Sequence, residues 1–308
     1  MPAPNHVRHP SLPRRPWLLA AATACALLLA ASSHPGASAL NALAALRGHL
    51  EAQNLAYGPL DRQRFDLYRP AAREPAAPTP LVFFVHGGTW ASGDRATYRF
   101  VGEALAAEGF IVMVIDYRLY PAVRYPAFVQ DTALAVAYAL EHARALGADP
   151  RRVVLFGHSA GAYNAAMVAL DPRWLQAEQH APAELAGWIG LAGPYNFLPI
   201  GDPTTKLVFQ WPNTAADTQP VRHVDDVPHG VPAFLGAAVE DDIVHATRNT
   251  VPLARALQQR GVPVTERLYD RVGHASLVGA LAFPLTGLAP VLEDLARFIV
   301  QAPPARAG

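Results

Sequence analysis

The chain has 308 residues, of which 51% are hydrophobic and 16% are charged, and its 25 basic and 25 acidic residues give a formal net charge of zero. This length and apolar content are sufficient for one large domain with a sizeable core. The balanced charge, with no basic stripe along the sequence, argues against a nucleic-acid partner.

The first 39 residues have the organisation of a secretory signal peptide. Arginines within the first fifteen residues precede an apolar run over residues 17–31, which is short for a membrane-spanning helix. Ala37-Ser38-Ala39 fits the small-residue cleavage pattern. We therefore expect a signal peptide at 1–39, a secreted or periplasmic mature chain from Leu40, and no stable membrane association after cleavage. An uncleaved anchor is the alternative.

Cys25 is the only cysteine of the chain. It would be the lipidated residue of a lipoprotein, but Ala22 stands where a large apolar residue usually precedes such a cysteine, and apolar sequence continues beyond it. A mature chain that begins at Leu40 contains no cysteine and can form no disulfide.

Beyond the leader, predicted strands alternate with predicted helices. Leu40, Leu43, Leu46 and Leu50 recur at helical spacing and predict a short amphipathic helix. Apolar runs predict strands at 81–85, 111–115, 153–156, 188–192, 233–238 and 264–269. Helical periodicity predicts helices at 98–108, 127–146, 160–170, 248–260 and 288–300. This alternation predicts an α/β fold, a mostly parallel sheet with helices on both faces, formed by residues 40–308 as one domain. The irregular stretch 196–232 is either a lid or a surface excursion.

Gly157-His158-Ser159-Ala160-Gly161 lies between the strand at 153–156 and the helix at 160–170. A G-x-S-x-G sequence between a strand and a helix predicts a nucleophile elbow. The two glycines allow the backbone to turn tightly, and the turn exposes the hydroxyl of Ser159 above the sheet.

Two partners for this serine follow in the chain order acid, then histidine. Asp241 and Asp242 both follow the strand at 233–238, and His274 lies in a predicted loop after the strand at 264–269. A serine hydroxyl becomes a good nucleophile when a base such as histidine takes its proton. The carboxylate then holds the tautomer of that histidine and stabilises its imidazolium form. Position alone leaves both aspartates as candidates for the acid.

His86-Gly87-Gly88-Thr89-Trp90 follows the strand at 81–85. A glycine pair at a strand exit allows backbone N–H groups to point into a site. We expect the N–H groups of Gly88, Thr89 and Ala160 to form an oxyanion hole for the tetrahedral intermediate, with Gly87 as a substitute for one of them.

These residues carry a family resemblance. The chain resembles the bacterial and fungal esterases of the α/β-hydrolase superfamily, which include carboxylesterases and kynurenine formamidase-like enzymes. The resemblance covers about residues 55–300 and rests on an H-G-G-x-W motif at 86–90, a G-H-S-A-G elbow at 157–161, a first-strand sequence at 57–59 and 65–70, and Asp116-Tyr117-Arg118-Leu119-Tyr120-Pro121 with Tyr125-Pro126-Ala127 and Asp131.

The resemblance also separates the alternatives. In the family the acid begins a D-x-x-V pattern, which Asp241 matches through Val244, so the resemblance favours Asp241 over Asp242. Thr89 stands where hormone-sensitive-lipase-like enzymes have a third glycine, which favours the H-G-G-x-W branch.

Together these features predict a serine hydrolase that cleaves small-molecule carboxylic esters, with short acyl groups, through an acyl-enzyme. An arylformamidase-like amide hydrolase is the main alternative, followed by a non-catalytic binding protein of the same fold; a peptidase is disfavoured because no gating module is visible. No H-E-x-x-H, cysteine pair or phosphate-binding Gly-Lys motif occurs, so we expect no cofactor and no metal. The oligomeric state stays open.

Overall fold

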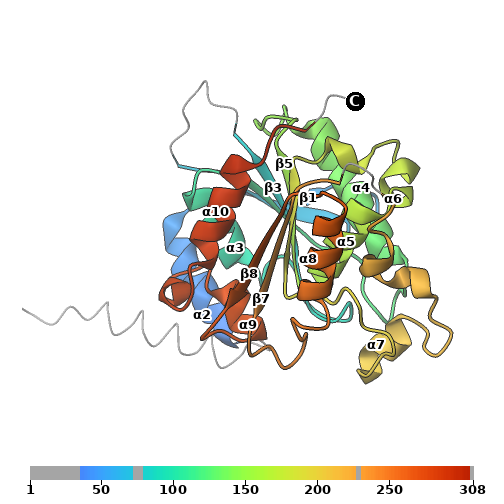
Figure 1. Cartoon of the computed structure of the whole chain (residues 1–308). Coiled ribbons are helices and arrows are strands. Elements are labelled where there is room, and N and C mark those ends of the chain that lie inside the picture. Colours follow the sequence, from blue (N-terminus) through green and yellow to red (C-terminus); the bar gives the residue numbers. More distant parts are fainter. Residues whose placement is uncertain (1–34, 72–78, 227–229, 306–308) are drawn as a thin grey trace, which may run out of the picture.

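The computed structural model describes residues 35–71, 79–226 and 230–305. Its centre is an eight-stranded sheet in the order β1-β2-β4-β3-β5-β6-β7-β8 (Figure 1). The strands are β1 Leu50–Ala56, β2 Arg64–Tyr68, β3 Leu81–Val85, β4 Ile111–Ile115, β5 Val153–His158, β6 Gly187–Leu191, β7 Ala233–Ala238 and β8 Val264–Tyr269. β2 pairs antiparallel with β1 and β4, and every pairing from β4 to β8 is parallel. The predicted mostly parallel α/β fold is therefore confirmed.

Helices cover both faces of this sheet. Their bounds are α2 Pro35–Ala44, α3 Arg99–Ala107, α4 Ala127–His142, α5 Ala160–Leu170, α6 Arg173–Ala177, α7 Pro203–Val208, α8 Thr250–Gln259, α9 His274–Gly279 and α10 Val291–Gln301. In Figure 1, α2, α3 and α10 lie on one face, and α4, α5, α6 and α8 lie on the other. The sheet is thus the middle of three layers, as expected when parallel strands are joined by helical crossovers.

The central strands are apolar along their whole length because both of their faces are covered. All five residues of β3 are buried, and they alternate between the two cores. Leu81, Phe83 and Val85 belong to the core under α4 and α5, whereas Val82 and Phe84 belong to the core under α3 and α10. The carboxyl ends of the parallel strands meet at one edge, where α7 and α9 lie in Figure 1. That edge is where α/β folds place their ligand sites.

The predicted amphipathic helix over Leu40–Leu50 is correct only in its first part. Helix α2 ends at Ala44, a 3-10 turn follows, and Gly48, with φ of 73°, ends the helical path. Leu46 is 84% exposed, and Leu50 begins β1 opposite Tyr68 of β2. Pairing with the edge of the sheet therefore overrides the helical spacing of the last leucine.

Two further predictions need correction. His274 does not lie in a loop: Gly273 caps a short helix, α9, of which His274 is the first residue. The predicted helix 127–146 ends earlier, at His142.

The irregular stretch 196–232 contains the six-residue helix α7.

Residues 1–34 of the predicted leader, including Cys25, lie outside the described residues, whereas residues 35–39 form the first half of α2. Among the helices of the described ranges, none is long and apolar enough to cross a membrane.

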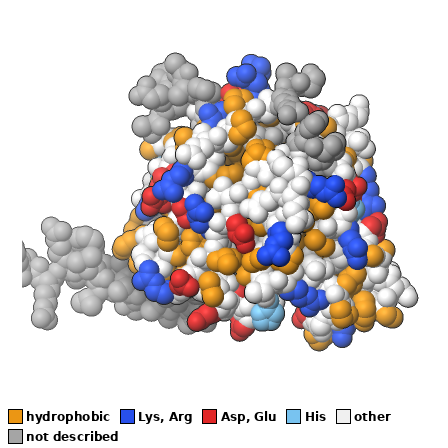
Figure 2. Space-filling view, in the orientation of Figure 1, with side chains coloured by type: hydrophobic (Ala, Val, Ile, Leu, Met, Phe, Trp, Pro, Cys, Tyr) orange, Lys and Arg blue, Asp and Glu red, His pale blue; other side chains and the backbone are white. Residues whose placement is uncertain are grey.

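The surface carries mixed charges. Figure 2 shows basic and acidic side chains interspersed over the visible face, in keeping with the zero net charge. Hydrophobic side chains gather at the lower right of that view, over α7. Leu207 in α7 and Trp211 just after it are among the exposed large apolar residues.

Candidate active site

Ser159 occupies the sharp turn between β5 and α5. Its backbone has φ of 54° and ψ of −120°, a conformation that non-glycine residues rarely adopt. The turn is held by the Ser159 N–H, which donates to Leu191 O at 2.8 Å, and by the Ser159 carbonyl, which accepts from Tyr163 N at 3.1 Å. A side chain on Gly157 would collide with the backbone of Gly161, so the turn needs glycine there. The strained turn and the hydroxyl at its apex fit a nucleophile elbow.

His274 reaches the serine from the other side of the site. Its Nε2 lies 2.8 Å from Ser159 Oγ, and its side chain is only 11% exposed. Its Nδ1 lies 2.8 Å from Oδ2 of Asp241. The three side chains come from positions 159, 241 and 274, yet they form one continuous line of hydrogen bonds.

Asp241 rather than Asp242 faces the histidine. Its second oxygen, Oδ1, accepts from the backbone N–H groups of Ile243 at 2.9 Å and Val244 at 2.8 Å, while Asp242 is exposed. Burial alone would raise the pKa of Asp241, but the hydrogen bonds from His274 and from these two amides outweigh it and hold the pKa below its ordinary value.

These partners fix the proton positions. An ionised Asp241 can only accept, so Nδ1 of His274 carries a proton and Nε2 has the lone pair that faces the Ser159 hydroxyl. The serine proton therefore has an acceptor in line with the nucleophile. This arrangement is suited to nucleophilic attack by Ser159.

The loop after β3 provides backbone donors. Gly88, Thr89 and Trp90 all have positive φ, and the Gly88 carbonyl accepts from the N–H groups of Ala91 and Ser92, which curls the loop. Within the described residues, the N–H groups of Gly88, Thr89 and Ala160 donate no hydrogen bond to the protein. Thr89 and Ala160 line the same cavity as Ser159. Neither Gly88 nor Gly87, its expected substitute, lines that cavity.

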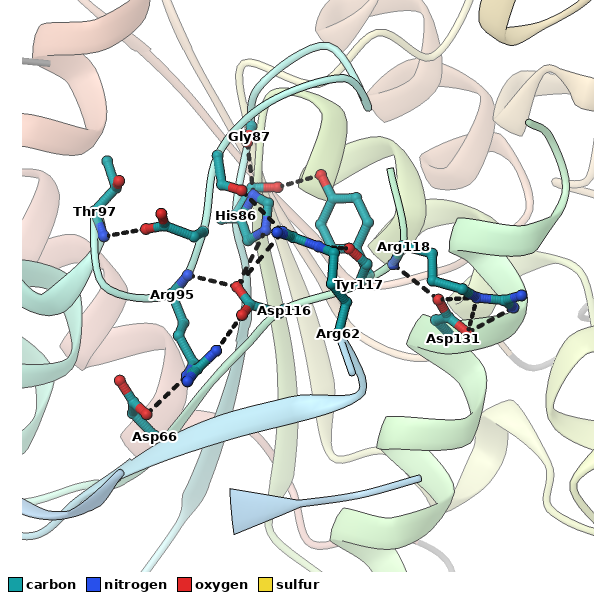
Figure 3. A network of polar contacts seen from close by, with 12 residues as sticks. Arg62, Asp66, His86, Gly87, Arg95, Thr97, Asp116, Tyr117, Arg118 and Asp131 are labelled. Atoms are coloured by element: carbon teal, nitrogen blue, oxygen red, sulfur yellow. Dashed lines mark hydrogen bonds and ion pairs between the residues drawn. The ribbon is translucent and has the colours of Figure 1, made fainter. Parts of the chain in front are cut away.

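Half-buried arginines and buried carboxylates hold this loop in place (Figure 3). Arg95 pairs with Asp116 at the end of β4 and donates through Nε to Asp66 of β2 at 2.8 Å. Arg62 donates to the Tyr117 carbonyl at 2.7 Å. The segment that follows the glycine pair is therefore tied to two neighbouring strands by ion pairs that lie partly out of water.

His86 supports the glycine pair from beneath. Its Nδ1 donates to the Gly87 carbonyl at 2.7 Å, and its ring stacks on Tyr117 with centroids 4.4 Å apart. Burial lowers the pKa of His86 to about 4, so the ring is neutral near neutral pH. Because the peptide between Gly87 and Gly88 is planar, a fixed Gly87 carbonyl also fixes the direction of the Gly88 N–H.

The Asp116–Asp131 segment that carries part of the resemblance has a supporting role. Arg118 forms an ion pair with Asp131 of α4 at 2.8 Å (Figure 3). Gln63 donates to the same carboxylate at 2.8 Å. These contacts tie the loop after β4 to α4 and to the start of β2. None of these side chains lines the cavity at Ser159.

A cavity of about 340 Å³ opens beside Ser159. Trp90, Phe197 and Ile200 supply apolar walls, and Arg248 and Asp202 are among its polar lining residues. The stretch 196–232, expected to be either a lid or a surface excursion, thus contributes part of the wall. A second cavity, of about 490 Å³, is lined by Arg260 and eleven residues without ionisable side chains, and it holds none of the candidate residues.

Sequence reasoning missed three polar neighbours of the site, of which His158 and Asn164 are buried and Tyr98 is half-buried. Tyr98, His158 and Asn164 have polar contacts with the elbow, the histidine or the loop after β3. His158 stood out only as the variable position of the elbow motif, and nothing in the sequence connects it with Tyr98. In the described part of the chain, no group of three or more histidine, cysteine or acidic side chains is arranged to hold a metal ion.

Comparison with known families gives one match that covers most of the chain. The family model described as BD-FAE matches residues 65–251. The matched region begins in β2 and ends early in α8, so it contains Ser159, Asp241 and the loop after β3, whereas His274 lies beyond it.

Curated relatives are esterases by name. A probable isoprenylcysteine alpha-carbonyl methylesterase, ICME, of Oryza sativa subsp. japonica is 37% identical over 152 residues, which are 47% of this chain and 35% of that protein. Esterase LipC of Mycobacterium tuberculosis is 28% identical over 256 residues, which are 76% of this chain and 60% of LipC. The chain spans about a third of the length of the first of these relatives.

Solved structures share the fold. A thermophilic esterase from Thermogutta terrifontis, Est2, superposes with a TM-score of 0.65 over 83% of this chain and 93% of that chain, at 23% identity. A truncated carbohydrate esterase from gut microbiota superposes with a TM-score of 0.65 at 16% identity, over 82% of this chain and 97% of that chain.

Proposed function

The chain belongs to the BD-FAE family, and we propose that it is a serine esterase that cleaves small carboxylic esters through an acyl-enzyme. The observation that carries the proposal is the unbroken line Asp241–His274–Ser159, with both of its hydrogen bonds at 2.8 Å. The esterase names of the curated relatives support the same activity.

In the first half of the reaction, Ser159 Oγ attacks the ester carbonyl while Nε2 of His274 takes its proton. The carbonyl oxygen becomes negative and receives hydrogen bonds from the free N–H groups of Gly88, Thr89 and Ala160; each such donor is worth about 3–4 kcal/mol in a transition state. The ionised Asp241 stabilises the imidazolium of His274. His274 then returns the proton to the leaving alcohol, and the acyl group stays on Ser159.

In the second half, water attacks the acyl-enzyme. His274 accepts a proton from the water as it attacks the ester carbonyl, and the same three N–H groups hold the second oxyanion. Collapse of this intermediate releases the acid, and His274 returns its proton to Ser159. The first and the last proton transfer run between Ser159 Oγ and His274 Nε2, which already lie 2.8 Å apart.

The cavity supports a preference for short acyl groups. At about 340 Å³ it is near the lower end of the range for small-molecule sites, and Trp90 and Phe197 pack against each other in its wall with ring centroids 6.2 Å apart. The exposed apolar residues Leu207 and Trp211 do not line it. We therefore propose activity on dissolved esters, without activation at a lipid interface.

A series of p-nitrophenyl esters from acetate to palmitate tests the proposal. The purified protein should cleave acetate and butyrate best, and a fluorophosphonate should label Ser159. Ser159→Ala should abolish labelling and lower kcat by several orders of magnitude with an unchanged circular dichroism spectrum. Undiminished hydrolysis by the variant would refute the role of Ser159.

The choice of substrate separates the alternatives. Faster cleavage of aryl formamides than of matched esters would favour an amide hydrolase. Palmitate cleaved better than butyrate, with a jump in rate above the micellar threshold, would indicate a lipase instead.

A further inference from the structure

We propose that Tyr98 and His158 are positioning residues that hold the backbone of His274 in place for proton transfer from Ser159. The inference rests on the proposed function and adds two residues to its machinery. Neither side chain lines the cavity beside Ser159. Both act on the reaction only through the backbone that they support.

His158 is the last residue of β5 and directly precedes the nucleophile. It is 3% exposed, and its Nε2 lies 3.1 Å from the carbonyl oxygen of His274. Its ring centroid lies 5.1 Å from that of His274. Its Nδ1 lies 3.4 Å from the hydroxyl of Tyr98, the residue that precedes α3. One buried side chain therefore contacts both the histidine segment and the start of α3.

We call the contacts from Tyr98 to His158 and from His158 to His274 the bridge. Its donors and acceptors are consistent with one placement of the protons. The His274 carbonyl can only accept, so the proton of a neutral His158 ring lies on Nε2. Burial lowers the pKa of His158 to about 3, which keeps the ring neutral at working pH. Nδ1 is then an acceptor for the Tyr98 hydroxyl.

The bridge joins three parts of the site that are far apart in the sequence. It begins at Tyr98 before α3, passes through His158, the last residue of β5, and ends at His274, the first residue of α9. Gly87 lies so close that a methyl group on it would be 3.1 Å from His158 Nδ1 and 3.0 Å from Ser159 Cβ. The loop after β3 therefore packs against the same buried His158 side chain that contacts the backbone of His274.

Two physical effects follow for the reaction. The hydrogen bond to its carbonyl fixes the backbone of His274, and a displacement of about 1 Å between reacting groups can cost about 100-fold in rate. The neutral state of His158 also matters, because a positive charge 5.1 Å from His274 would oppose the imidazolium that forms during attack. Asp241 and Tyr98 are the other titratable groups in contact with this pair.

Three variants test the bridge. His158→Leu removes the donor to His274, His158→Gln keeps an N–H donor on a side chain of similar length, and Tyr98→Phe removes the hydroxyl only. The matched controls are His142→Gln and Tyr138→Phe, a second His–Tyr pair that stacks with centroids 4.0 Å apart at the far end of α4. Active sites are counted by fluorophosphonate titration, so that kcat refers to folded, reactive enzyme.

We expect His158→Leu to lower kcat about 30- to 100-fold with KM changed less than about threefold, because the loss lies in proton transfer rather than in substrate binding. His158→Gln should recover about tenfold of this loss, and Tyr98→Phe should cost about three- to tenfold. The acid limb of kcat/KM should move to lower pH in His158→Leu, because Asp241 stabilises the imidazolium of a displaced His274 less. The controls should stay within about twofold of wild type.

A packing role predicts different results. Normal kcat per titrated site in His158→Leu, or equal losses in the Gln and Leu variants with an unchanged pH profile, would overturn the inference. If His158→Leu does not fold, His158→Gln, Tyr98→Phe and their double-mutant cycle decide: additive effects, or no loss of kcat, refute the bridge. Failure of the proposed function is distinct, because the wild-type protein would then neither be labelled at Ser159 nor depend on it.

Discussion

Two buried neutral histidines make the stability of this protein sensitive to mild acid. Burial lowers the pKa of His86 to about 4 and that of His158 to about 3, whereas an unfolded histidine has a pKa near 6.5. Below pH 6.5 the unfolded chain therefore binds protons that the folded chain cannot bind. Stability is lost progressively as the pH falls from about 6.5 towards these two folded values.

The magnitude follows from the two shifts. Between pH 7 and pH 5, each histidine should remove about 2 kcal/mol from the free energy of unfolding, or about 4 kcal/mol together. That is a large share of the roughly 5–15 kcal/mol by which domains are stable. The loss begins well above the pH range in which carboxylates such as Asp241 titrate, because the pKa of Asp241 is itself lowered.

Urea unfolding at pH 7, 6 and 5 measures the effect. We expect the loss in free energy of unfolding between pH 7 and 5 to be about 2 kcal/mol smaller in His158→Gln and in His86→Gln than in wild type. Each variant removes one histidine that takes up a proton when the chain unfolds. His142→Gln, which replaces a half-buried histidine at the end of α4, is the control and should keep the wild-type loss. Identical losses in wild type and in both variants would refute the reasoning, since the folded protein would then bind protons on these rings at ordinary pH.

Three further predictions concern the acid of the site, its cavity and the leader. Asp241→Asn should lower kcat/KM by about 10³- to 10⁴-fold because it changes the tautomer of the histidine, whereas the exposed Asp242→Asn should change it less than about twofold; equal losses would contradict the assignment. Phe197→Ala should raise the kcat/KM ratio of hexanoate to acetate esters about tenfold by enlarging the cavity, and an unchanged ratio would place the acyl group elsewhere. We also propose export with cleavage before Leu40, so N-terminal sequencing of exported protein should begin there; an intact Met1 in a membrane fraction would favour an anchor.

Cleavage at that position is compatible with the fold. Leu40 and Ala44 are the buried apolar residues of α2, and Asn41 donates to the carbonyls of Ala96 and Thr97 before α3. All three residues would remain in the mature chain. The loss of residues 35–39 would shorten α2 but keep these contacts with α3.

The sequence predicts the buried centre of the fold well because burial on both faces demands unbroken apolar runs. The bounds of β3, β4, β7, β8 and α5 agree with those expected. The edge of the sheet is harder: β1 has the sequence LEAQNLA, without a buried residue, and depends on its pairing with β2. Short helices such as α7 and α9, with six residues each, have too few positions to show a period.

The candidate site was likewise predictable from the sequence only in part. Motif order predicted Ser159, an acid and His274 as partners, because the fold fixes the order in which such residues follow their strands. The structure brings the three side chains within hydrogen-bond distance of one another in sequence. The choice between Asp241 and Asp242 came from a resemblance, and the geometry supplies the physical reason: the turn after β7 buries the first side chain and exposes the second. The contact between Tyr98 and His158 joins residues 60 positions apart and has no local pattern.

The buried contacts of the site hold residues with a strained backbone conformation in place. Ser159, Thr89 and Trp90 all have φ near 55°, a conformation that costs about 1–3 kcal/mol at each non-glycine residue and persists only where the surroundings impose it. The surroundings do so here: the Trp90 indole donates to Asn164 of α5 at 3.0 Å, and the Ser159 backbone is bonded on both sides. Ser159 and the loop after β3 are therefore braced against the same helix, α5. A relaxed loop would be more stable locally, but its N–H groups would no longer point in fixed directions, and fixed donors are what stabilise an oxyanion without reorganisation.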